Sequence, residues 1–282
     1  IRCWPRWRGL SVALKSNPLV RFNTWLRDAW RAGGTGGLNW HLHAATSQSR
    51  WRGTQQQIDR FLARVQPTQR QLLLIGGSAG WMMSSAWLSC FKHIDIIDID
   101  PLAPMLFARR HGPALKQVGC SWQFHRQDGI AGLPALLRQY PQSFVWFDNV
   151  LGQLRYRLDD EAALERQLAQ LQRWLDGRAW GSVHDLYSGP VSTDLPHDVS
   201  SMCQSAEHAQ VGADGIPLYR VDRQLTSLDD WGQLLLQRVD AEGIWQDHCT
   251  GVVFPTGTSV QLIPWNFKPR YCHWLELGWI RS

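Results

Sequence analysis

An apolar run that enters a glycine-rich turn constrains the fold of this 282-residue chain more than any other feature. The run covers residues 72–75, and the turn covers residues 76–80 and holds three glycines. Four consecutive aliphatic residues before such a turn are typical of a buried strand that leads into a helix. The turn exposes backbone N–H groups and lets a ligand approach the main chain closely. The sequence therefore predicts a strand, a ligand-binding turn and a helix over 81–90.

The same alternation of apolar runs and helical stretches continues along the chain. The expected strands cover residues 72–75, 94–97, 122–125, 144–147 and 180–186. The expected helices cover 55–65, 81–90, 101–110, 133–138 and 159–175, with Thr54 as the N-cap of the first and Pro101 opening the third. The tail adds a helix at 227–237 and strands at 245–254, 259–265 and 272–280. This order predicts a parallel sheet with helices on both faces.

The first part of the chain is basic and rich in tryptophan. Residues 1–70 hold twelve Arg and Lys against two Asp, a net charge of about +10, whereas the remainder carries about −5. Interleaved aromatics, Trp40 and Trp51 among them, would suit stacking on the bases of a nucleic acid. The alternative, which we favour, is a solvated basic face. We divide the chain into an extension (1–53) and an α/β domain (54–282), with an insertion on the substrate side at 187–225.

Neither a membrane span nor a secretory leader is expected. Residues 72–91 carry no charge and are long enough to cross a bilayer, but their glycines and serines divide them into a strand, a turn and a helix. Lys15 interrupts the apolar stretch near the start, which argues against a signal peptide. The six cysteines form no CxxC pair and favour a reducing, cytoplasmic setting.

The spacing of the turn residues narrows the choice of ligand. Asp98 ends the second expected strand, and its carboxylate can accept hydrogen bonds from both ribose hydroxyls of a nucleoside-containing cofactor. The dinucleotide fingerprint G-x-G-x-x-G would need glycine where this chain has Trp81. The spacing G-x-[G/S]-x-G is matched instead, by Gly76, Ser78 and Gly80.

That spacing resembles motif I of the class I S-adenosylmethionine-dependent methyltransferases. Residues 97–101 (Ile-Asp-Ile-Asp-Pro), 124–129 and 144–149 are similar to the motifs that follow in this family, and 177–186 to its next strand. The resemblance covers about residues 54–190. It implies a Rossmann-like, doubly wound, mostly parallel seven-stranded sheet with helices on both faces. It also implies S-adenosylmethionine as the cofactor and methyl transfer as the reaction.

The resemblance assigns roles to individual residues. The implied cofactor-binding set is Gly76, Gly77, Ser78, Gly80, Asp98, Ile99, Asp128, Gly129 and Asp148. Asp98 takes the ribose position and Asp128 lies near the adenine amino group. Asp148 and Asn149 are the catalytic candidates, where cofactor and acceptor meet, with His184 and Asp185 as secondary ones. The methyl acceptor is expected to be a small molecule rather than a nucleic acid.

No metal site is expected, because the histidines show no ligand spacing with carboxylates or cysteines.

Several candidate site residues also have a purely structural interpretation. Asp98 or Asp100 could cap the following helix, Asp128 could end a strand, and Asp148 could be a turn residue. Ser78 replaces the family's middle glycine, and Ile75 stands where the family closes its first strand with an acidic residue.

Three other functions remain open at this point. Residues 75–80 and 98–100, together with Asp128 and Asp148, are also similar to motifs of the spermidine synthase-like aminopropyltransferases. The chain departs from that pattern at two places. Ala79 replaces the Asp of the family's glycine loop, and residues 149–151 lack the second acidic residue of its later motif. The second alternative is a non-catalytic, methyltransferase-like protein that binds nucleic acid through its basic arm. The third is a nicotinamide dehydrogenase, which Trp81 disfavours.

Overall fold

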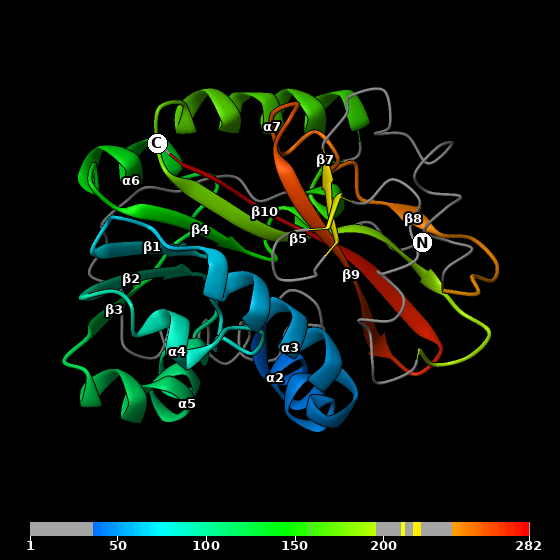
Figure 1. Cartoon of the computed structure of the whole chain (residues 1–282), viewed down its shortest axis with the longest axis horizontal. Helices are drawn as coiled ribbons and strands as arrows, with labels where there is room; N and C mark the ends of the chain where they lie inside the picture. Colours follow the sequence, from blue (N-terminus) through cyan, green and yellow to red (C-terminus); the bar gives the residue numbers. More distant parts are fainter. Residues whose placement is uncertain (1–35, 159, 196–209, 212–216, 221–238, 282) are drawn as a thin grey trace, which may run out of the picture.

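The computed structural model describes residues 36–158, 160–195, 210–211, 217–220 and 239–281 (Figure 1). Its helices are α2 (Gly37–Thr46), α3 (Gln48–Arg64), α4 (Ser85–Leu88), α5 (Ala103–Gln117), α6 (Leu133–Gln139), the 3-10 helix η1 (Gly152–Tyr156) and α7 (Glu161–Leu175). Its strands are β1 (Gln71–Ile75), β2 (His93–Asp98), β3 (Ser121–Arg126), β4 (Phe144–Asp148), β5 (Trp180–Pro190), β6 (Gln210–Val211), β7 (Pro217–Arg220), β8 (Gln246–Asp247), β9 (Ser259–Lys268) and β10 (Tyr271–Ile280). The expected helix at 227–237 and most of the expected insertion lie outside the described residues.

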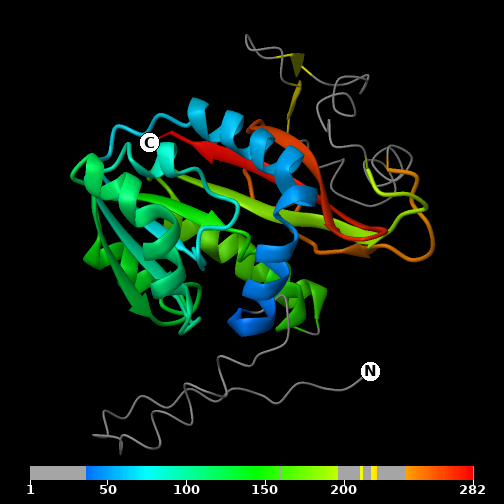
Figure 2. The same ribbon diagram turned by 90° about the horizontal axis from the view of Figure 1, so that it is seen from below.

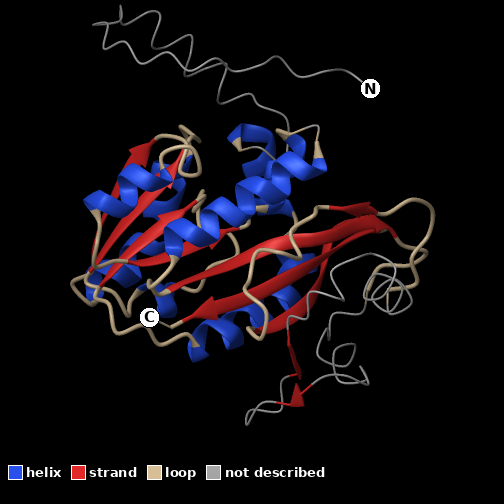
Figure 3. Ribbon diagram, turned by 90° about the horizontal axis from the view of Figure 1, so that it is seen from above, coloured by secondary structure: helices blue, strands red, loops and turns tan. Residues whose placement is uncertain are grey.

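The strands form one sheet in the order β3-β2-β1-β4-β5-β10-β9-β7-β6, with β8 paired to β5. The pairs from β3 to β5 are parallel, whereas β10 is antiparallel to both β5 and β9. The predicted mostly parallel sheet with helices on both faces is therefore confirmed. It holds ten strands in the described residues rather than seven, because the chain after β5 adds the short strands β6, β7 and β8. Figure 3 shows the long strands reaching beyond the short parallel ones.

Helices cover both faces of β1, which explains its continuous apolar run. Leu73 and Ile75 join the core formed with α6 and α7, whereas Leu72 and Leu74 join the core formed with α3, α4 and α5. All four side chains are fully buried. Figure 1 shows α7 on one side of the sheet and α3 and α5 on the other. A strand that is covered on both faces has no polar side to alternate with.

The helix α3 extends further toward the N-terminus than expected. It begins at Gln48, so Thr54 is not its N-cap but lies within it, and its hydroxyl donates to the carbonyl of Pro264 at 3.0 Å. The boundary expected between residues 53 and 54 falls inside this helix. Figure 2 shows α3 lying along the strand pair β9–β10. Trp51, expected as a candidate for stacking on bases, is fully buried against that pair.

Three other expected elements are shorter or shifted. The helix expected over 81–90 is reduced to α4, because the left-handed backbone of Gly80 (φ 63°) leads into turns before Ser84 caps the helix. The helix expected from Pro101 begins at Ala103, after an Asp100 carboxylate that accepts from the Leu102 N–H. The strand expected at 245–254 is reduced to β8, because Cys249 has a left-handed backbone (φ 55°) that a pleated strand cannot accommodate.

Residues 72–91 form β1, a turn and α4, as expected. Within the described part of the chain, no helix combines the length and the apolar character needed to cross a membrane.

Candidate functional site

The register of the parallel strands brings the candidate residues to one edge of the sheet. Ile75 lies beside Ile97 and Phe147, and Asp148 lies beside Val183. The chain therefore leaves β1, β2 and β4 at the same level, which is where ligands bind in open α/β sheets. A cavity of about 400 Å³ opens there. This volume lies within the range of small-molecule sites.

The glycine-rich turn forms one wall of this cavity. Gly76 has a left-handed backbone (φ 74°), and a Cβ on it would lie 2.7 Å from the Cβ of Val150. Ser78 also has a positive φ (42°), which is the conformation that favours glycine at this position. A Cβ on Gly80 would collide with the ring of His111. The turn can therefore take this shape only with glycine at positions 76 and 80.

His111 fixes the turn from beneath. Burial lowers the pKa of His111 to about 4, so the imidazole is neutral at physiological pH. Its Nε2 contacts the Gly80 carbonyl at 3.0 Å and its Nδ1 contacts the Ser85 hydroxyl at 2.7 Å. Because a carbonyl can only accept, Nε2 carries the proton and Nδ1 accepts from Ser85.

The Asp98 carboxylate connects the turn to the end of β2. Its Oδ2 accepts from the Ser78 N–H at 2.7 Å and its Oδ1 accepts from the Asp100 N–H at 2.8 Å. Burial raises the pKa of Asp98 to about 6; these two hydrogen bonds oppose the rise, and the neighbouring Asp100 charge adds to it. Asp98 lines the cavity, so lone pairs not used by the two N–H groups are available to a ligand.

Asp100 fastens α2 across the turn. Its Oδ2 accepts from the Gly37 N–H at 2.7 Å and lies 2.9 Å from Nε2 of His41. Burial acts to raise the pKa of Asp100, but the contacts with His41, Gly37 and Leu102 outweigh it and hold the pKa below its usual value. On the same helix, the indole of Trp40 donates to the Ser78 hydroxyl at 3.2 Å. The N-terminal part of the described chain is thus built into the cavity wall.

Asp148 is the most isolated charge of the site. It lies at the end of β4 and lines the cavity, and its carboxylate has neither a hydrogen bond nor an ion pair with any described residue. Burial, with a smaller contribution from the charge of Asp98, raises the pKa of Asp148 to about 7. When they are ionised, these two neighbouring carboxylates favour a positively charged group at this end of the cavity, although Arg157 and Lys268 also line it.

The remaining candidates line the cavity but also hold the local structure. Asn149 has a left-handed backbone (φ 51°), and its side-chain oxygen accepts from the Asp185 N–H at 3.1 Å. Asp128 accepts from the Ile130 and Ala131 N–H groups through Oδ1, and its Oδ2 lies 2.7 Å from Nη1 of Arg157. These contacts give Asn149 and Asp128 structural tasks besides any contact with a ligand.

The structure brings most of the sequence-derived set together. Eight predicted residues line the one cavity: Gly76, Ser78, Asp98, Ile99, Asp128, Gly129, Asp148 and Asn149. Gly77 and Gly80 do not; Gly77 packs on Leu74 and Gly80 on His111. Of the two secondary candidates, Asp185 lines the cavity, whereas His184 is fully buried and pairs with Glu276 at 2.9 Å. Neither residue ends β5, which continues to Pro190.

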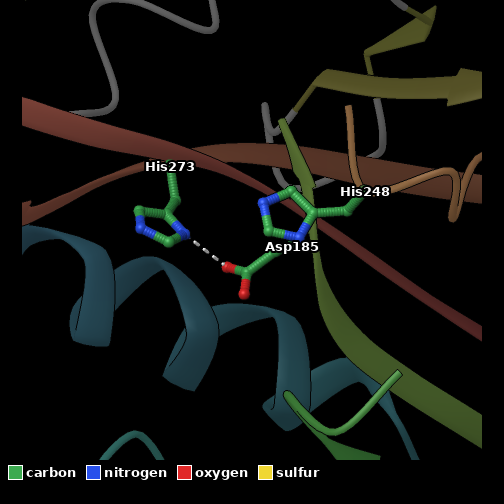
Figure 4. Close-up of side chains that lie close together, drawn as sticks. All are labelled: Asp185, His248 and His273. Carbon is green, nitrogen blue, oxygen red and sulfur yellow. Dashed lines mark hydrogen bonds and ion pairs between the residues drawn. The ribbon is translucent and has the colours of Figure 1, made fainter. Parts of the chain in front are cut away.

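The opposite wall was not foreseen from the sequence. It consists of side chains from β9 and β10, namely Trp265, Phe267, Lys268, Tyr271 and His273. Trp265 and Phe267 on β9, and Tyr271 and His273 on β10, are each two residues apart, which marks them only as one face of a strand. Nothing local connects these residues to the glycine-rich turn. A buried cluster of Asp185, His248 and His273 beside this wall was also not predicted from the sequence (Figure 4). These three residues come from separate segments, so no ligand spacing marks them.

No model of a known protein family matches this sequence, and no curated protein matches it. Several solved structures resemble the chain. Magnesium protoporphyrin IX methyltransferase from Synechocystis, with bound SAH, is 16% identical over 93% of this chain and 94% of that chain, with a TM-score of 0.38. The N-methyltransferase NodS from Bradyrhizobium japonicum, in complex with S-adenosyl-L-homocysteine, is 11% identical over 91% and 97%, with a TM-score of 0.42. An O-methyltransferase family protein from Burkholderia thailandensis is 13% identical over 94% and 70%, with a TM-score of 0.38.

Proposed function

We propose that this protein binds S-adenosylmethionine at the glycine-rich turn and transfers its methyl group to a small-molecule acceptor. The observation that carries the proposal is the pair of buried carboxylates, Asp98 and Asp148, which both line the cavity. The cationic side chains that also line it are engaged elsewhere, because Arg157 pairs with Asp128 and Lys268 lies over the ring of Tyr271. A cavity of this charge favours a ligand with a positive centre. The sulfonium of S-adenosylmethionine is such a centre.

The chain offers a contact for each part of the cofactor. The turn presents backbone next to the cavity, and the free lone pairs of Asp98 suit the ribose hydroxyls. Asp128 and Gly129, at the end of β3, stand on the adenine side. Asp148 stands where the sulfonium would lie. The nicotinamide alternative is disfavoured because Trp81 stands where the dinucleotide fingerprint needs glycine.

The bound cofactor supplies an electrophilic methyl group on a good leaving group. The protein therefore has mainly to orient the acceptor in line with that group and to exclude water. Trp40, Trp265 and Phe267 give the acceptor side an aromatic surface that suits a molecule with an apolar body. Asp148, whose pKa is raised to about 7 by burial, can take up a proton from the acceptor at neutral pH.

The test is calorimetric titration of the full chain with S-adenosylmethionine, S-adenosylhomocysteine, methylthioadenosine and NAD in parallel. We expect micromolar binding of the first two and none of NAD. Preference for methylthioadenosine would replace methyl transfer by aminopropyl transfer, whose donor is also a sulfonium cation. Binding of none of the four would contradict the proposal.

The charge of the site predicts a pH-dependent affinity. Because the pKa of Asp98 is raised to about 6 and that of Asp148 to about 7, both groups are largely protonated below pH 5 and largely ionised above pH 8. Affinity for S-adenosylmethionine should therefore rise between these limits, by about tenfold or ~1.4 kcal/mol. The uncharged thioether of S-adenosylhomocysteine should show a smaller rise.

Asp148→Asn provides the matched variant for this prediction, because it keeps the shape and removes the charge. It should lower affinity for S-adenosylmethionine at pH 8 and flatten the pH profile, while affecting S-adenosylhomocysteine less. Calorimetry at several pH values measures both ligands. An unchanged ratio of the two affinities in the variant would show that Asp148 does not face the sulfonium.

A further inference from the structure

The cluster of Asp185, His248 and His273 joins three segments beside the cavity. Asp185 lies on β5, His273 on β10, and His248 directly after β8. Each residue offers one ligand atom, and these atoms all lie within 4.8 Å of one another. Figure 4 shows the carboxylate of Asp185 between the two imidazole rings. The Asp185 Oδ1 and the His273 Nδ1 are 2.8 Å apart, a hydrogen-bond distance that has to widen to about 3.4 Å for both atoms to bind one tetrahedral zinc ion.

The hydrogen bonds of His248 set its tautomer for metal binding. Its Nδ1 contacts the carbonyl of Gly152 at 3.1 Å and therefore carries the proton. Its Nε2 then has a free lone pair, which faces the hydroxyl of Ser188 at 2.9 Å. That hydroxyl has a second partner, the hydroxyl of Tyr271 at 3.3 Å, to which it can turn. A backbone carbonyl on the far nitrogen is the usual support of a metal-binding histidine.

The three residues are all buried, so the cluster is shielded from bulk solvent. A carboxylate and neutral imidazoles are the forms that coordinate metals. The hydrogen bond to the Gly152 carbonyl already holds His248 with its proton on Nδ1 and the lone pair of Nε2 free.

We propose that Asp185, His248 and His273 form a binding site for one divalent transition-metal ion of the zinc, iron or cobalt type. Two imidazole nitrogens and one carboxylate are the donor set that such ions prefer, and three protein ligands leave a position open. Binding replaces the proton shared by His273 Nδ1 and Asp185 Oδ1, and that proton is released to solvent.

The open position faces the cavity, because Asp185 and His273 both line it. In that position the ion would polarise a bound oxygen and lower its pKa. If methyl transfer is the reaction, which this extension alone assumes, the acceptor is a hydroxyl compound whose oxygen ligates the ion. The metal site itself does not depend on that assumption.

The experiment uses the full chain after removal of metal with a chelator. It is titrated with Co²⁺, followed by visible absorption, and with Zn²⁺, followed by calorimetry. We expect one ion per chain and a ligand-field spectrum for Co²⁺. His248→Gln and His273→Gln should each weaken Zn²⁺ binding by at least about 100-fold.

His93→Gln is the matched control. His93 also lies beside a carboxylate, with its Nε2 3.3 Å from Asp95, but it does not line the cavity. The His93→Gln variant should bind Zn²⁺ with the same affinity as the unmodified protein. Binding that survives both cluster variants, or no stoichiometric binding by the unmodified protein, would overturn the proposal.

A second measurement covers the case in which the cluster variants do not fold, which circular dichroism would show. X-ray absorption of the Zn²⁺-loaded, unmodified protein counts imidazole ligands directly, and fewer than two would overturn the proposal. Titration of the metal-free protein with S-adenosylmethionine tests the proposed function separately. Cofactor binding without metal binding contradicts only the metal site, and metal binding without cofactor binding contradicts only methyl transfer.

Discussion

Replacing Asp98 by alanine is expected to weaken binding of S-adenosylmethionine by about 100-fold, or ~2.7 kcal/mol. The carboxylate accepts from the N–H groups of Ser78 and Asp100, and a hydrogen bond to a charged group contributes about 1.5–3 kcal/mol. Its removal frees the glycine-rich turn from β2 and also removes the acceptor for the ribose. Calorimetric titration with S-adenosylmethionine and S-adenosylhomocysteine measures the loss, which should be similar for both because both contain the ribose.

Asp95→Asn is the control for this prediction. Asp95 lies on the same strand but contacts His125 at 2.7 Å and His93, and it does not line the cavity. The Asp95→Asn variant should bind S-adenosylmethionine and S-adenosylhomocysteine with the affinities of the unmodified protein. If Asp98→Ala folds, as judged by circular dichroism, and its affinity changes less than about threefold, or ~0.6 kcal/mol, the assignment of Asp98 to the ribose is wrong.

Replacing Trp51 by alanine is expected to lower the free energy of unfolding by about 3–5 kcal/mol. The side chain is fully buried, and its indole N–H donates to the carbonyl of Phe267 at 3.0 Å. Its ring packs edge-on against Trp265, with centroids 5.0 Å apart. The substitution therefore leaves a large cavity between α3 and β9 and removes one of the two hydrogen bonds to the Phe267 carbonyl, of which the other comes from His43. Urea unfolding followed by circular dichroism measures the effect.

Two other variants of α3 serve as comparisons for Trp51→Ala. Trp51→Phe keeps an aromatic ring and loses mainly the hydrogen bond, so it should cost about 1–2 kcal/mol. Gln56→Ala changes an exposed residue of the same helix and should alter stability by less than about 0.5 kcal/mol. A loss below about 1 kcal/mol for Trp51→Ala would mean that α3 does not support the strand pair as described.

The parallel half of the fold could be predicted because its signals are local. The run 72–75 is aliphatic at every position since both faces of β1 are covered, and the expected strands at 94–97, 122–125 and 144–147 lie inside β2, β3 and β4. Element ends were less predictable. The helix expected over 81–90 is only α4, because the backbone of Gly80 directs the chain into turns that no periodicity reveals.

The glycine-rich turn and the carboxylates of the candidate site were predictable for a related reason. Each follows a strand directly, and parallel strands end at one edge of the sheet, so Asp98 and Asp148 had to lie near each other. The raised pKa values of the two groups were not predictable, since they depend on burial and on the coupling of two charges from different strands.

The sequence by itself determined the succession of strands and helices along the parallel half of the chain and the residues that end its strands, because both follow from patterns within a few residues. Only the tertiary structure decided what faces them. The antiparallel return of β9 and β10 brings His273 to Asp185, and the segment after β8 brings His248 to the same point. Contacts between residues so far apart in the chain arise from packing, and packing leaves no spacing in the sequence.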